Sequence, residues 1–134
     1  MELTGVSLTR LQTCDPRLIG VMTKAAKYLP IMIVCGHRDQ AAQDAAFESH
    51  TSKTPWPQSK HNSQPSLAVD FAPLKPDGTI DWNNTKSFVY MAGWILAFGA
   101  AVGIKLRSGA DWNGNRLIEK GDDWDPGHIE VCDV

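Results

Sequence analysis

The 134-residue sequence lacks the features that mark several large classes of protein. It has three cysteines and no CxxC motif, so neither a disulfide framework nor a zinc knuckle built from cysteines is indicated. Its longest apolar stretch, residues 91–104, is shorter than the roughly 20 residues of a membrane span. The first residues lack a basic flank and an apolar core. We therefore expect reduced thiols, no membrane insertion and no signal peptide.

Positive charge is not in excess either. Lys and Arg together number 13 against 15 Asp and Glu, which gives a formal net charge of −2. Proteins that bind nucleic acid usually show the opposite imbalance, so no nucleic-acid partner is expected. The composition, 43% hydrophobic and 21% charged, is that of an ordinary soluble domain. The length predicts one domain over residues 1–134.

Helical and extended patterns follow one another without a regular strand–helix–strand rhythm. Asp15 and Pro16 are typical of a helix start, and helical spacing of apolar residues continues to Leu29. The remaining pattern predicts a helix after Asp39, a helix over about 84–102, and strands over 31–35, 67–71, 104–107 and 129–131. This order predicts an α+β fold with a small, largely antiparallel sheet packed with helices.

Two long segments are predicted to be loops. Residues 50–65 are polar with three prolines, and residues 108–127 are rich in Gly, Asp and Asn. Loops of this length often carry function. Trp82, Trp112 and Trp124 fall in predicted loops, where they either anchor the loop or frame a cleft.

Two of the four histidines have informative neighbours. His61 lies in a polar loop that leads into a predicted strand, and Asp70 lies nine positions later on that strand. His128 lies near the end of the sequence. Two imidazoles and one carboxylate suffice for a catalytic zinc site that keeps its fourth position for water. Because His61 and His128 are far apart in sequence, the residue types alone do not establish the site.

A hydrolase also needs a group that moves protons. Asp125 lies three residues before His128 across a Pro-Gly turn, and Glu130 lies two residues after it on a predicted strand. Either carboxylate is a possible general base, and spacing alone does not choose between them.

Several short stretches resemble one family of enzymes. Ser59-x-His61 with Ala68-x-Asp70, followed by Asp125-x-x-His128-x-Glu130, is similar to the zinc-binding signature of the M15 peptidases. This family contains D-Ala-D-Ala carboxypeptidases and dipeptidases and the phage L-alanyl-D-glutamate endopeptidases, and the phage endolysins are the most similar. Further matching stretches, from about residue 30 onward, are Gly36–Arg38, Asp70–Pro73, Ile80–Trp82 and Leu106–Asn113.

The resemblance implies a role for each matching residue. His61, Asp70 and His128 would be the zinc ligands, and Asp125 rather than Glu130 the catalytic acid and base. Glu130 is expected to be either a partner that orients a metal-bound imidazole or a residue on the strand face, and not a ligand. The implied fold is Hedgehog/DD-peptidase-like.

Arg38 and Ser59 also match residues of the family, whereas the gap between His61 and Asp70 differs from the family pattern. Arg38 matches a cation that binds substrate or stabilises the oxyanion, although it could instead pair with Asp39 or Asp44 on the surface. Ser59 matches a residue that hydrogen-bonds near the substrate. The gap between His61 and Asp70 is two residues longer than is usual in the family, which puts an insertion into residues 62–67, a segment expected to affect the local wall of the cleft.

The resemblance predicts a zinc-dependent endopeptidase that cuts the L-alanyl-D-glutamate bond of peptidoglycan stem peptides during phage lysis. We expect a monomeric catalytic domain without a wall-binding module. It would stay in the host bacterial cytoplasm until a holin-type factor opens the way to the cell wall. Two alternatives are a D-Ala-D-Ala carboxypeptidase of the same fold and a non-catalytic wall-binding or virion domain that retains the zinc site.

Overall fold

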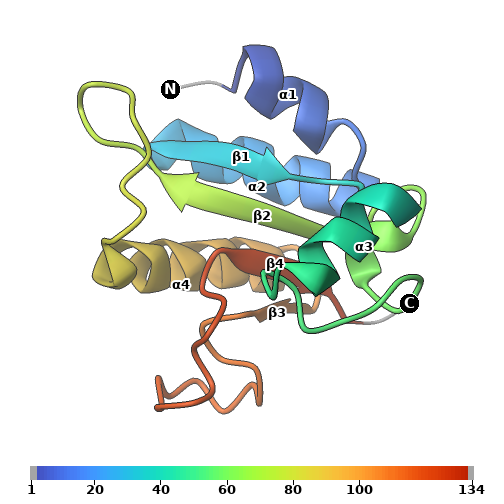
Figure 1. Ribbon diagram of the computed structural model, residues 1–134. Coiled ribbons are helices and arrows are strands. Elements are labelled where there is room, and N and C mark those ends of the chain that lie inside the picture. Colours follow the sequence, from blue (N-terminus) through green and yellow to red (C-terminus); the bar gives the residue numbers. More distant parts are fainter. Residues whose placement is uncertain (1–2, 133–134) are drawn as a thin grey trace.

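The structure is a computed structural model that describes residues 3–132 of the chain (Figure 1). Four strands form one antiparallel sheet in the order β1-β2-β4-β3. Helices and strands are mixed in sequence, which confirms the predicted α+β class. The elements are α1 (Gly5–Leu11), α2 (Pro16–Tyr28), β1 (Ile31–Cys35), α3 (Gln40–Glu48), a 3-10 helix η1 (Lys60–Asn62), β2 (Ala68–Pro73), α4 (Thr85–Ala101), β3 (Leu106–Ser108) and β4 (His128–Val131).

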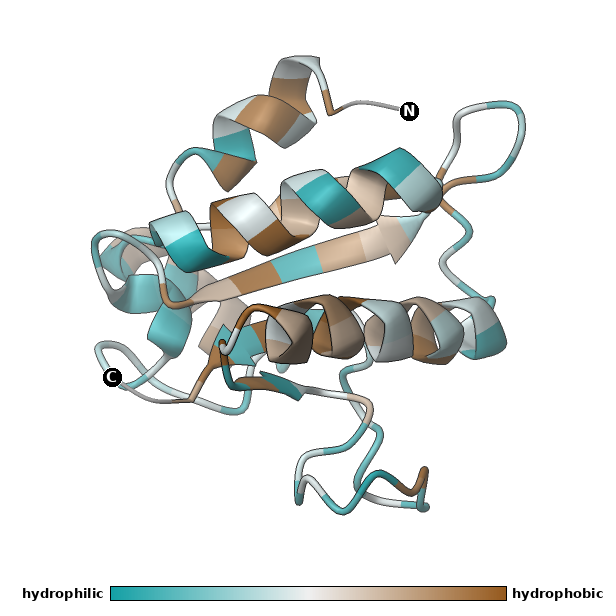
Figure 2. Ribbon diagram, turned by 180° about the vertical axis from the view of Figure 1, so that it is seen from behind, coloured by the Kyte–Doolittle hydropathy of each residue, from teal (hydrophilic) through white to brown (hydrophobic). Residues whose placement is uncertain are grey.

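The hydrophobic core lies between one face of the sheet and the helices α2 and α4. Figure 2 shows these two helices lying side by side across the sheet, with apolar residues along α4 and along one side of α2. Met22 and Ile95 from the helices and Phe71 and Ile129 from the strands are almost fully buried there. The α1 helix packs beside β1, and α3 lies on the opposite side of the sheet from α2 (Figure 1). The core thus leaves one sheet face available for other side chains.

Three helices begin where the sequence predicts. Asp15 accepts a hydrogen bond from the Arg17 amide, Asp39 from the Ala42 amide, and Asn84 from the Ser87 amide. Each side-chain oxygen satisfies an amide that the first helical turn leaves unpaired.

The structure corrects the sequence-based elements at three places. The α1 helix was not predicted, because only Ser7 and Leu11 are buried in its seven residues and no side chain caps its start. The loop over residues 50–65 contains η1. The strand expected over 104–107 is β3 and begins at Leu106.

The register between β2 and β4 decides which side chains meet on the face away from the core. Asp70 pairs with His128 and Ala68 pairs with Glu130, while Val69 and Ile129 between them point into the core. Because side chains alternate along a strand, Asp70, His128 and Glu130 share one face. Among the described residues, no helix is both long and apolar enough to cross a membrane.

Candidate active site

His61, Asp70 and His128 converge at one point on the open face of the sheet. The Nε2 atom of His61 lies 3.2 Å from Asp70 Oδ1, and the Nδ1 atom of His128 lies 3.3 Å from the same oxygen. The two imidazole rings are 5.2 Å apart between centroids and meet edge to face. The structure therefore brings together two nitrogens and one carboxylate oxygen from η1, β2 and β4.

Each imidazole is also held from behind by an acceptor. The second ring nitrogen of His61, Nδ1, lies 2.7 Å from the Gly36 carbonyl oxygen, and that of His128, Nε2, lies 2.9 Å from Glu130 Oε1. When these rear nitrogens donate their hydrogens, the front nitrogens carry lone pairs directed toward Asp70. Metal-binding histidines are commonly oriented in this way.

The electrostatic environment of the cluster favours the binding of positive charge. Burial by itself lowers the pKa of His61, but the Asp70 carboxylate outweighs that effect and raises the pKa to about 10. Burial likewise opposes ionisation of Asp70, yet His61 and His128 hold its pKa well below the ordinary value. The pKa of His128 is raised by its hydrogen bonds to Asp70 and Glu130 against the effect of burial. Either a proton on an imidazole or a bound divalent cation can supply the positive charge that the Asp70 carboxylate stabilises.

The donor set fits a catalytic metal ion. Two neutral imidazole nitrogens and one carboxylate oxygen are a known three-residue ligand set for zinc, and other divalent metals also accept it. Ligand atoms of Asp70, Asp125 and His128 also lie within 4.8 Å of one another. A metal held by His61, Asp70 and His128 would therefore have the Asp125 carboxylate close by.

Asp125 is positioned by close packing of the backbone. Its amide donates to the Gly109 carbonyl and its own carbonyl accepts from the His128 amide, which closes the turn before β4. A Cβ atom at Gly109 would lie 1.7 Å from the Asp125 carbonyl oxygen, so only glycine allows this approach. Burial, and then the nearby Asp70 charge, raise the pKa of the Asp125 carboxyl above its ordinary value.

Arg38 turns toward the cluster instead of pairing with Asp39 or Asp44 on the surface. Its Nη2 atom lies 3.6 Å from Asp70 Oδ2, and its Nη1 donates to Gln43 Oε1 at 2.9 Å. The side chain of Gln43 is fully buried. Arg38 therefore contributes positive charge to the floor of the site.

Ser59 begins the short helix that carries His61. Its hydroxyl oxygen accepts a hydrogen bond from the His61 amide, while the Asn62 side chain accepts one from the Ser59 amide. These reciprocal bonds form a capping box that fixes the turn. Ser59 also faces the cleft described below, and its role toward a substrate stays a prediction.

Glu130 is buried between His128 and two cations. Its Oε2 atom lies 2.7 Å from Arg107 Nη2 and 3.1 Å from Lys60 Nζ. Burial raises the pKa of Glu130, but the His128 hydrogen bond and these cations lower it to about 2. Glu130 is thus an ionised partner behind His128, in the position that the sequence predicted.

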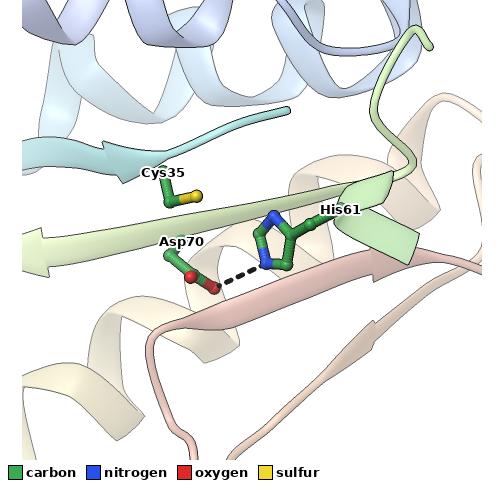
Figure 3. A group of neighbouring side chains, drawn as sticks. All are labelled: Cys35, His61 and Asp70. Atoms are coloured by element: carbon green, nitrogen blue, oxygen red, sulfur yellow. Dashed lines mark hydrogen bonds and ion pairs between the residues drawn. The ribbon is translucent and has the colours of Figure 1, made fainter. Parts of the chain in front are cut away.

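Cys35 also lies in the cluster, although no sequence pattern predicted it there (Figure 3). Simple alternation along β1 would put Cys35 on the core face with Ile31 and Ile33. A β-bulge between Ile33 and Cys35 instead brings Cys35 opposite Asp70. Bulges of this kind re-aim side chains and are common near active sites. Burial raises the pKa of the thiol, but its contact with His61 outweighs this and lowers the pKa.

A cleft of about 320 Å³ lies over the cluster. Residues 51–54, Trp112 and Trp124 are part of its lining. The two indole rings stack at 4.9 Å, and Trp112 also lies 5.1 Å from the His128 ring. Trp112 and Trp124 therefore frame the cleft, whereas Trp82 is exposed and lies outside its lining.

The segment over residues 62–67, where the resemblance implied an insertion, contributes no residue to the lining of the cleft. The Ser66 amide donates to the Thr13 carbonyl, and the Ser66 carbonyl accepts from the Asp15 amide. Ser66 is fully buried against the turn between α1 and α2. Within the extra length, Ser66 therefore packs against the turn between α1 and α2, and none of residues 62–67 lines the cleft.

Comparison with known proteins identifies the class to which this chain belongs. Residues 1–132 match a family described as phage L-alanyl-D-glutamate peptidase. A protein named L-alanyl-D-glutamate peptidase from Escherichia phage T5 is 37% identical over 130 residues, covering 91% of each chain. The chain belongs to the phage L-alanyl-D-glutamate peptidase family.

The fold has a solved counterpart as well. The crystal structure of the Serratia marcescens L-Ala D-Glu endopeptidase ChiX matches with a TM-score of 0.76 at 23% identity. The match covers 98% of this chain and 90% of the other. At this identity the likeness establishes the fold.

Proposed function

We propose that this chain is a zinc-dependent endopeptidase that hydrolyses the amide bond between L-alanine and D-glutamate in peptidoglycan stem peptides. The observation that carries the proposal is the convergence of His61 Nε2, His128 Nδ1 and Asp70 Oδ1 beside the Asp125 carboxylate. Membership of the family and the name of the phage T5 relative support the choice of bond.

His61, Asp70 and His128 are the proposed ligands. A zinc ion bound by them would act as a Lewis acid and lower the pKa of a bound water from 15.7 to about 7. The chain's own contribution is to place the hydrogen of each imidazole on its rear nitrogen, so that the front nitrogen is directed toward the proposed metal position. The Gly36 carbonyl does this for His61 and the Glu130 carboxylate does it for His128.

Asp125 is the proposed general base and acid. Its carboxylate is near Asp70 and His128, and its raised pKa favours proton uptake. In this role it accepts the proton of the attacking water and later delivers that proton to the leaving amine of D-glutamate. Glu130 is less suited to the task, because both of its oxygens already have partners.

Arg38 and Ser59 complete the proposed set. The Arg38 guanidinium adjoins Asp70, so it can stabilise negative charge that develops on the scissile carbonyl oxygen. The Ser59 oxygen accepts from the His61 amide, which leaves the Ser59 hydroxyl hydrogen for a substrate carbonyl. Both side chains face the cleft.

The proposal also covers the oligomeric state of the protein and its location in the cell. The chain would act as a monomeric catalytic domain in phage lysis, held in the host bacterial cytoplasm until a holin-type factor gives it access to the wall. Family membership supports the phage origin. Light scattering of the purified protein tests the monomer. Expression in the host with and without a holin tests the access step, with lysis expected only in its presence.

Mass spectrometry of digested peptidoglycan tests the reaction itself. Purified wall material is incubated with the protein, with and without a chelator. The expected result is a new N-terminal D-glutamate that does not form with the chelator present. Release of D-alanine alone would favour a carboxypeptidase, and an unchanged wall would favour a binding domain; either result contradicts the proposal.

A further inference from the structure

Lys53 differs from the other cations of the cleft in having no carboxylate partner among residues 3–132. Arg38 pairs with Asp70, while Lys60 and Arg107 pair with Glu130. Lys53 Nζ instead lies 4.0 Å from the centroid of the Trp124 ring. Its charge is therefore not cancelled by an anion of this part of the chain.

Contacts continue from Lys53 to the proposed metal ligands. Lys53 lies over Trp124, Trp124 stacks on Trp112, and Trp112 lies against His128. Trp124 also directly precedes Asp125 in the sequence. The Lys53 ammonium thus stands at the rim of the cleft, next to the segment that carries the proposed base.

The backbone that carries Lys53 is fixed by the buried Gln43 side chain. Its Nε2 atom donates to the Ser52 hydroxyl at 3.0 Å and to the Thr54 carbonyl at 2.6 Å. Its Oε1 atom accepts from Arg38 Nη1 at 2.9 Å. One amide therefore holds the loop on both sides of Lys53 and orients Arg38 at the cleft floor, which fixes the two cations relative to each other.

We propose that Lys53 is a specificity-determining residue that binds a carboxylate of the substrate peptide, with the Trp124 ring as its support. This inference rests on the proposed function. In a stem peptide whose D-glutamate is linked through its γ-carboxyl, the α-carboxylate next to the scissile amide stays free. This α-carboxylate belongs to the residue that supplies the leaving amine, which Asp125 is proposed to protonate. Lys53, at the rim of the cleft beside the segment that carries Asp125, is therefore placed to bind it.

The ion pairs within the cleft make Lys53 better suited than Arg38 to bind a substrate carboxylate. Arg38 already faces the Asp70 carboxylate, which reduces its attraction for a second anion. Lys53 gives up only a contact with an aromatic face, a weak interaction at an exposed site. Arg38 then remains available for the reacting carbonyl.

Two soluble stem peptides, identical except at the D-glutamate α-position, test the inference. One carries the α-carboxylate and the other the neutral α-carboxamide. With the carboxylate peptide, Lys53→Gln is expected to lower kcat/KM about fivefold to tenfold, mainly through KM, and Lys53→Arg to restore most of it. With the carboxamide peptide, wild type and Lys53→Gln should have similar kcat/KM. Lys86→Gln, an exposed α4 variant outside the cleft lining, is the matched control and should change neither rate.

The outcomes separate the two proposals. Equal losses on both peptides, or no loss on either, would overturn carboxylate recognition by Lys53 and leave the proposed function standing. Failure of the wild type to cut either peptide would overturn the proposed function and this inference together. Selective loss on the carboxylate peptide, weakened further by added salt, supports the inference.

Discussion

The imidazole of His128 is held between two carboxylates, Asp70 in front and Glu130 behind. The rear contact decides which ring nitrogen carries hydrogen, so it governs how well the front nitrogen can bind a metal. Arg107 and Lys60 keep Glu130 ionised and in place. A change at Glu130 should therefore act on the metal through His128.

We expect Glu130→Ala to weaken zinc binding about 10- to 100-fold, because the rear acceptor is lost. Glu130→Gln should weaken it less, since its amide oxygen can still accept from His128. Competition with a chromophoric chelator measures both affinities. Glu48→Gln, on the exposed surface of α3, is the control. Unchanged zinc affinity in Glu130→Ala would contradict the orienting role.

A change at Asp125 should act on the reaction and leave the metal in place. Asp125→Asn is expected to lower kcat about 10²- to 10⁴-fold, since the amide cannot accept the proton of the attacking water. Its zinc content, measured by atomic spectroscopy, should equal that of the wild type. Asp123→Asn, on the same loop, should keep full activity. A fully active Asp125→Asn variant would refute Asp125 as the base.

The sequence identified some site residues and missed others for a physical reason. His61, Asp70 and His128 were singled out through the resemblance to the M15 peptidases, since residue types and spacing alone did not establish a site; the structure brings the three side chains together. Cys35 was missed because a bulge changes the side to which it points. Gln43 and Lys53 were missed because their importance comes from tertiary contacts that residue type does not reveal.

At the scale of one helix, the start of α2 links stability to pH. Asp15 accepts from the Arg17 amide at 2.9 Å and pairs with the Arg17 guanidinium. The hydrogen bond from Arg17 lowers the pKa of Asp15 below 3.8. Because the folded pKa is the lower one, the stabilisation is complete above pH 3.8 and is lost as acid protonates Asp15.

We expect Asp15→Ala to lower the free energy of unfolding at pH 7 by about 1 kcal/mol, the usual value of an N-cap. Asp15→Asn keeps the cap oxygen and loses only a partly exposed ion pair, so its cost should be smaller. Urea unfolding between pH 7 and pH 3 measures both variants. The difference between wild type and Asp15→Asn should shrink on acidification, and a difference that grows would contradict the assigned direction.

Two glycines in different settings give a contrasting pair of variants. Gly109→Ala is expected to destabilise the fold and reduce activity, because the new Cβ would overlap the Asp125 carbonyl. Gly20→Ala, inside α2 with nothing near its Cβ position, should stabilise by about 0.5–1 kcal/mol. Thermal unfolding and peptide cleavage measure both. A neutral Gly109→Ala would mean that the Gly109–Asp125 approach is not required.

For the whole molecule, metal and fold should stabilise each other, since the ligands come from three separate elements. Zinc at about 100 times its Kd should add about 2.7 kcal/mol to the free energy of unfolding, or roughly 10 °C in Tm. A chelator should reverse the shift. His61→Ala should show neither the shift nor activity. Equal zinc shifts in His61→Ala and wild type would place the ion elsewhere.

Much of the fold was accessible from the sequence because helix caps and apolar periodicity are local signals. Asp15, Asp39 and Asn84 mark three helix starts correctly. The order of strands in the sheet was not accessible, because pairing between distant segments leaves no local mark. The α1 helix was missed because its burial depends on β1, against which it packs.

The position of β4 in the sheet also sets an order of events during synthesis. This strand lies between β2 and β3, yet it follows both of them in the chain. A ribosome therefore releases both neighbours before the strand that joins them, and His128 emerges long after Asp70. Until then β3 has no partner strand in the sheet, and only His61 and Asp70 of the proposed metal ligands have been made. His128 belongs to one of the last described elements to be made, so a chain that ends before β4 lacks one of the three proposed metal ligands.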